Sequence, residues 1–110
     1  MKRRRTLRQY ANQLRKELPT GYRVSVRVVE MPKGGEENER HRDFADTKFD
    51  GGRHYIRVNR AFSKPVQKDC LEHEWAHCMV PWDDECEHSD EWGRAYARVL
   101  RVTTGWEDLS

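Results

Sequence analysis

The spacing of apolar residues near the N-terminus changes from helical to strand-like within a few positions, and this change constrains the fold most. Five apolar residues share one helical face: Leu7, Tyr10, Ala11, Leu14 and Leu18. They predict a helix over residues 5–18 that ends before Pro19 and Gly21. Four more alternate with polar residues: Tyr22, Val24, Val26 and Val28. This second pattern predicts a strand with one buried face, which ends near Met31 and Pro32.

The middle of the chain has the pattern of a β-hairpin. Residues 33–43 (KGGEENERHRD) are polar and predict a surface loop. Two alternating segments, 44–49 and 53–59, then flank Asp50-Gly51-Gly52. Because a tight hairpin turn requires positive φ angles, the Asp-Gly pair favours a turn at this point. With the first strand, the hairpin would complete a sheet of three strands.

Two further helices are predicted in the C-terminal half. Ser63 is a candidate cap for a helix that tolerates Pro65 in its first turn and ends at Pro81. Ser89 is the candidate cap of the last helix, which stops near Gly105. The prediction is therefore one α+β domain over residues 1–110. Its small three-stranded sheet, antiparallel or mixed, packs on an N-terminal helix, a central helix and a C-terminal helix.

Composition restricts the class of protein. Apolar residues make up 35% of the 110 residues and charged residues 36%, so the core is expected to be small, and a bound metal would help to hold the fold. No apolar run is long enough for a membrane span, and the first residues do not resemble a signal peptide. The odd number of cysteines, 3, suits a reducing compartment. We therefore expect a cytoplasmic protein with no membrane association.

The N-terminal quarter is strongly basic. Residues 1–27 hold nine Lys or Arg and one acid, whereas the whole chain carries a net charge of only +2. Such a cluster can contact the phosphate backbone of nucleic acid or an acidic partner. The plainer interpretation is a solvated helix face.

The segment HEWAH, residues 73–77, carries the strongest chemical signal. On a helix, His73 and His77 project from one face about a turn apart, close enough to hold one ion. Glu74 lies beside the first histidine, where its carboxylate can take a proton from a water held by the ion. Catalytic zinc usually has three protein ligands, and His88 is the candidate for the third.

Other residues near the motif leave alternatives open. Cys86 can join the three histidines and close the site around a structural zinc ion. Cys70, Cys78, Trp75 and Trp92 are interpreted as packing residues. Asp90 or Glu91 can orient a ligand imidazole or simply complement the helix dipole. Four residues are weak candidates for polarising a carbonyl: Tyr96, Tyr55, His54 and His41. The plainer interpretation makes Tyr96 a core residue and His54 an exposed strand residue.

These residues resemble a known family. HEWAH, the following HSDEWGRAYARVL and the preceding RHYIRVNRAF are similar to segments of SprT-like zinc metallopeptidases, especially the short versions found in phage genomes. The similarity covers about residues 44–103. It implies a minimal zincin-like domain that binds Zn2+ through His73, His77 and His88. It also implies that Glu74 is the general acid and base of peptide hydrolysis, and that a phage-encoded chain would act in the host cytoplasm.

The substrate is expected to be a protein or peptide. In zincin-like sites a substrate can lie along the edge of the sheet, and the strand at 53–59 is the candidate edge. Six acids between Asp83 and Glu91 would favour basic substrates. The alternative from another functional class is a small DNA- or protein-binding module that uses the basic N-terminal helix and keeps zinc for stability. The sequence gives no indication of oligomeric state.

Overall fold

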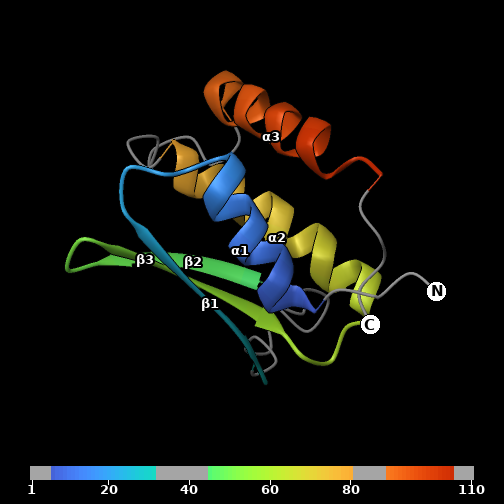
Figure 1. Ribbon diagram of the computed structural model, residues 1–110. Coiled ribbons are helices and arrows are strands. Elements are labelled where there is room, and N and C mark those ends of the chain that lie inside the picture. The colour runs from blue at the N-terminus through green and yellow to red at the C-terminus, as the bar shows by residue number, and fades with distance from the viewer. Residues whose placement is uncertain (1–5, 32–44, 81–88, 106–110) are drawn as a thin grey trace.

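Two helices cover one face of a three-stranded sheet, and a third lies on the outer side of one of them (Figure 1). The computed structural model describes residues 6–31, 45–80 and 89–105. Its elements are α1 (Leu7–Glu17), β1 (Arg23–Val29), β2 (Ala45–Asp50), β3 (Arg53–Asn59), α2 (Lys64–Met79) and α3 (Asp90–Thr103). α1 and α2 pack on the sheet and α3 packs on α2. The predicted α+β class, with three helices and three strands in the described residues, is therefore confirmed.

The sheet is mixed, and its strand order is β1-β3-β2. β1 pairs with β3 in parallel, with Arg23 opposite Arg53, and β2 pairs with β3 antiparallel. β3 is thus the central strand, and the expectation that residues 53–59 form an edge is wrong. The reason is that β1 occupies the side of β3 that the hairpin leaves open. The edges of the described sheet are β1 and β2.

The hairpin between β2 and β3 follows the prediction. Gly51 and Gly52 have φ angles of 59° and 80°, which only glycine adopts without a steric penalty. Two consecutive left-handed residues make the tight turn whose twist matches that of the flanking strands. The turn thereby sets the register that places Thr47 opposite Ile56, on the face of the sheet that packs against the helices.

The first helix begins at a capping box. Thr6 accepts a hydrogen bond from the backbone N–H of Gln9, and the Gln9 side chain accepts one from the backbone N–H of Thr6. Two helix-end donors are thereby satisfied. All five predicted apolar residues of this segment are buried: Leu7, Tyr10, Ala11, Leu14 and Leu18. The helical face predicted from sequence is therefore confirmed.

α2 passes through the centre of the molecule. Its predicted stripe of Leu71, Trp75 and Cys78 is fully buried. The indole N–H of Trp75 donates to the carbonyl of Leu18 at 3.1 Å, which fixes the end of α1 against α2. Ser63 occupies the N-cap position, but its side chain makes no capping hydrogen bond. The Gln67 side chain donates to the carbonyl of Phe62 at 2.8 Å, which ties the first turn of α2 to the segment before it.

α3 begins as predicted at Ser89, whose hydroxyl accepts from the N–H of Trp92 at 3.1 Å. Its buried residues are Ala95, Val99 and Thr103. Leu100, which shares the predicted helical spacing, is 40% exposed, because among the described elements α3 packs mainly on α2 and buries a narrow face. Among the described helices, none is long and apolar enough to cross a membrane.

Candidate metal centre

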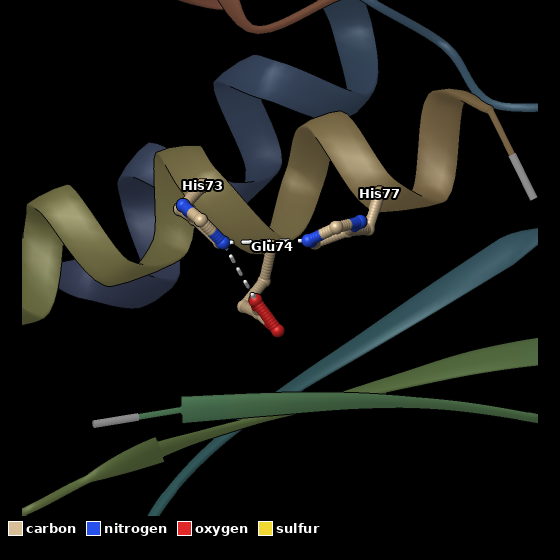
Figure 2. A group of neighbouring side chains, drawn as sticks. All are labelled: His73, Glu74 and His77. Atoms are coloured by element: carbon tan, nitrogen blue, oxygen red, sulfur yellow. Dashed lines mark hydrogen bonds and ion pairs between the residues drawn. The ribbon is translucent and has the colours of Figure 1, made fainter. Parts of the chain in front are cut away.

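His73, Glu74 and His77 form a cluster on α2, on the side of the helix that faces the sheet (Figure 2). A side chain of α3, Trp92, contacts both histidine rings. Their possible ligand atoms all lie within 4.8 Å of one another. The two histidines are one helical turn apart, as the sequence predicts, and their Nε2 atoms are 3.3 Å apart. The described part of the chain therefore brings together three of the four predicted site residues.

The distance between the two imidazole nitrogens suits a tetrahedral metal ion. Zinc binds histidine nitrogen at about 2.0–2.1 Å, so two ligands at a tetrahedral angle lie about 3.3–3.4 Å apart. The observed 3.3 Å between His73 Nε2 and His77 Nε2 matches this spacing. The same distance also permits a hydrogen bond between the rings when one Nε2 is protonated. The cluster could therefore hold a metal ion.

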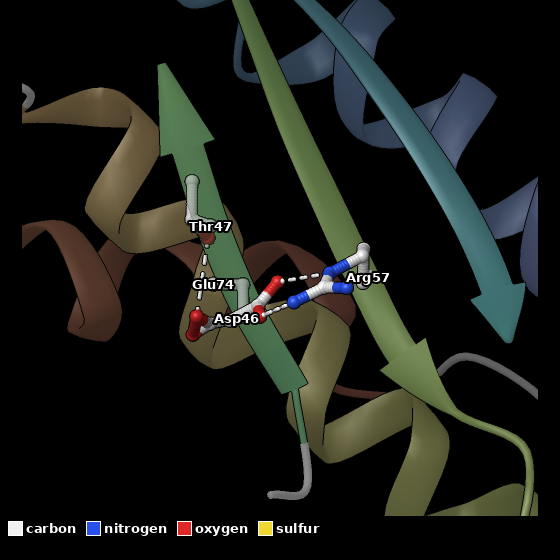
Figure 3. Close-up of polar contacts among 4 residues, drawn as sticks. All are labelled: Asp46, Thr47, Arg57 and Glu74. Carbon is white, nitrogen blue, oxygen red and sulfur yellow. Dashed lines mark hydrogen bonds and ion pairs between the residues drawn. The ribbon is translucent and has the colours of Figure 1, made fainter. Parts of the chain in front are cut away.

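The carboxylate of Glu74 is buried beneath the two histidines. Its Oε2 lies 4.0 Å from His73 Nε2, too far for a hydrogen bond and close enough to reach a small molecule between them. Its Oε1 accepts a hydrogen bond of 3.1 Å from the hydroxyl of Thr47 on β2 (Figure 3). Through this hydrogen bond, the edge strand β2 helps to orient the glutamate. The neighbouring residue on β2, Asp46, instead forms an ion pair with Arg57 on the opposite face of the sheet.

Two aromatic side chains from α3 pack against the histidines. The Trp92 ring lies 4.8 Å from His73 and 5.4 Å from His77 between centroids, and Tyr96 stacks on Trp92 at 5.0 Å. Trp92 and Tyr96 are partly buried, so the interpretation of both as core residues holds only in part. Burial, and then the charge of Glu72, raise the pKa of Tyr96. The helical spacing of Trp92 and Tyr96 showed that they share a face of α3, but nothing in the sequence showed that this face contacts the imidazoles.

The two described cysteines are packing residues, as expected. Cys78 is fully buried and Cys70 partly buried. Burial raises the pKa of Cys70 to about 11, and it raises the pKa of Cys78 as well. Both thiols therefore stay protonated near neutral pH, and a protonated thiol is a poor metal ligand.

His54 is buried, which contradicts its interpretation as an exposed strand residue. Only 2% of it is accessible, because it points to the same face of β3 as Ile56 and Val58. Its ring packs against Phe49 and Tyr22, with centroid distances of 4.9 and 5.9 Å. Burial lowers the pKa of His54 and keeps the ring neutral.

Tyr55, another candidate for polarising a carbonyl, points away from the cluster. It alternates with His54 and Ile56 along β3 and is 42% exposed on the face that the described helices leave uncovered. The sheet separates it from Glu74. Tyr55 is therefore excluded from a direct role at His73 and His77.

The remaining predicted site residues fall outside the described part of the chain. They are the third ligand His88, the alternative ligand Cys86, and His41. Asp90 and Glu91 are described; both are exposed in the first turn of α3, which suits their role in complementing the helix dipole. His88 and Cys86 remain predictions.

Comparisons with protein-family models, with curated proteins and with solved structures find no match to this chain. The resemblance to SprT-like metallopeptidases therefore remains a prediction from the motif.

Proposed function

We propose that the protein is a zinc-dependent metallopeptidase that hydrolyses peptide bonds with Glu74 as its general base. The 3.3 Å separation of His73 Nε2 and His77 Nε2, with the Glu74 carboxylate beside them, carries the proposal. The role of general base explains why a buried carboxylate lies next to a pair of imidazoles. A purely structural metal site would not require this carboxylate.

Each residue has a role in the proposed reaction. His73 and His77, together with His88, would hold Zn2+. When bound, zinc polarises a carbonyl group and lowers the pKa of a coordinated water to about 7. Glu74 takes a proton from the attacking water and returns it to the leaving nitrogen. Thr47 positions the Glu74 carboxylate through its 3.1 Å hydrogen bond. Trp92 limits ring rotation of both histidines and shields one side of the site from water.

The substrate would lie along β2 rather than β3. β2 is an edge of the described sheet, and Thr47 on this strand contacts Glu74. An extended peptide that pairs with the free edge of β2 would run past the carboxylate, with its register set by main-chain hydrogen bonds. An edge strand of the described sheet beside a helix that carries both histidines supports our proposal of a minimal zincin-like domain. Asp90 and Glu91 at the start of α3 add negative charge that favours basic peptides.

The test compares Glu74→Gln with the parent protein and with Glu17→Gln, which removes an exposed acid from the end of α1. We expect about one zinc per chain in all three proteins, as two or three histidine ligands require. Hydrolysis of a peptide library should be lost in Glu74→Gln, by at least about a hundredfold, since general-base catalysis contributes roughly 10²–10⁴-fold. Parent-like activity of Glu74→Gln would refute the role of the glutamate.

The open and the closed site are distinguished by the ligands of the ion. X-ray absorption of the zinc-loaded protein should show only nitrogen and oxygen neighbours if the site is open. A sulfur neighbour would show that Cys86 closes it and would favour a zinc-stabilised binding module, since a closed tetrahedral site leaves no position for water.

A further inference from the structure

Arginine side chains gather around a cleft beside β1, away from the metal cluster. The cleft has a volume of about 610 Å³ and is lined by residues from the end of α1 and the first half of β1. Figure 1 shows where these two elements lie. This volume falls within the range of about 300–1,000 Å³ for small-molecule sites. Its lining includes Arg15, Arg23 and Arg53, and no Asp or Glu belongs to the lining among the described residues.

Two of these guanidinium groups are held in place by neutral partners. Arg15 donates to the carbonyl of Val24 through Nε and Nη2, at 3.1 and 2.6 Å, and to the side chain of Asn12 through Nη1. Arg53 donates to the hydroxyl of Ser25 at 3.1 Å. Neither arginine makes an ion pair with a described residue. Both guanidinium groups are therefore oriented by neutral acceptors, although Asp50 is the cross-strand partner of Arg53 in the hairpin.

The charges also repel one another. Arg23 and Arg53 are opposite each other in the parallel pairing of β1 and β3, a position where like charges destabilise a sheet. Burial, and then the charge of Arg8, lower the pKa of Arg15. An adjoining hollow shares Arg15 and adds Arg8 and Arg27, again with no acid in its described lining. A bound anion would relieve this repulsion.

The cleft also offers hydroxyl and aromatic groups. Thr20 and Ser25 contribute hydroxyls, and Tyr22 is 49% exposed in the lining. Arginine forks match the geometry of phosphate oxygens, and an exposed tyrosine ring can stack on a planar group such as a base. These groups together suit phosphate better than an isolated carboxylate.

We propose that this cleft binds a phosphate-bearing ligand through Arg15, Arg23 and Arg53. The phosphate accepts hydrogen bonds from the three guanidinium groups, and the adjoining Arg8 and Arg27 favour a ligand with more than one phosphate. The site is independent of the proposed hydrolysis.

The experiment measures binding to the full chain by fluorescence polarisation at low salt. The two labelled probes are a nucleoside diphosphate and a short oligothymidylate, and the competitors are inorganic phosphate and polyglutamate. The test variant is Arg23→Gln/Arg53→Gln. The control is Arg94→Gln/Arg98→Gln, which removes the same charge from exposed positions on α3. Arg23→Gln alone serves if the double variant does not fold, since Arg23 is exposed.

We expect the test variant to bind at least about tenfold more weakly, as the loss of charge-assisted hydrogen bonds requires, while the control binds like the parent. Phosphate should compete and polyglutamate should not. Binding of the nucleoside diphosphate would identify a free ligand, and binding of the oligothymidylate alone a nucleic-acid strand. Equal binding by the test and control variants, equal competition by polyglutamate, or binding of neither probe would overturn the proposal.

Discussion

The hydrogen bond between Thr47 and Glu74 makes a measurable prediction about how the site is held together. Thr47→Val keeps the shape of the side chain and removes the hydroxyl that donates to Oε1 at 3.1 Å. Hydrogen bonds to charged groups are worth about 1.5–3 kcal/mol, and part of this is lost at a partly buried position. We therefore expect a loss of about 1–2 kcal/mol, or about 4–8 °C in Tm for a domain of this size. Valine favours strands as well as threonine does, so strand propensity will not add to the loss.

The assay is urea unfolding of a double-mutant cycle in the presence of a chelator. The cycle combines Thr47→Val with Glu74→Leu, because glutamine at position 74 would still accept the hydrogen bond. Glu74→Leu alone can stabilise the protein, because it removes a buried charge. Only the coupling energy between the two substitutions therefore reports on the hydrogen bond. Thr47→Ser is the control, because it keeps the hydroxyl. A coupling energy below about 0.3 kcal/mol would refute the claim that β2 orients the glutamate.

Three further predictions concern pH, the first helix and the metal. Because burial lowers the pKa of His54, folding disfavours its protonation, so stability should fall as the pH drops below 6.5; His54→Phe should flatten this dependence in urea unfolding. An unchanged slope would exclude His54 as its source. Thr6→Ala removes a capping box and should cost about 1 kcal/mol by thermal unfolding, and a neutral effect would contradict the capping role. Adding a chelator to zinc-loaded protein should lower its Tm. If zinc was present at a thousand times its Kd, the free energy of unfolding should fall by about 4 kcal/mol, whereas His73→Ala should show no change.

The periodicity of the sequence was enough to predict the elements but not their spatial order. The apolar spacing of α1 and α2 and the two glycines of the hairpin are local signals, and each was confirmed within a residue or two. Whether β1 pairs with β2 or with β3 depends on contacts between distant segments. The central position of β3 was therefore not predictable. Because β3 is central, the edge of the described sheet that lies next to Glu74 is β2 and not β3.

The candidate site was predictable for the same local reason. Two histidines four residues apart on a helix must share a face, whatever the rest of the fold does. The partners that come from other elements were not predictable. Thr47 reaches Glu74 only because the hairpin register turns it toward α2, and Trp92 reaches the imidazoles only because α3 lies across α2. His54 was assigned the wrong environment. The alternation of β3 puts it on the same face as Ile56 and Val58, but a polar residue at the end of that face can be either buried or exposed.

The mixed pairing of β3 sets an order for folding. The hairpin joins Asp50 to Arg53 across a tight turn, so β2 and β3 can meet after a short chain search, whereas Arg23 of β1 is much farther from Arg53 in the sequence. Long-range parallel pairing is slow, because the entropy of loop closure precedes any gain from contacts. We therefore expect the hairpin to form first and β1 to dock on it later. Substitutions in its glycine turn should mainly slow refolding, while substitutions in β1 should mainly accelerate unfolding.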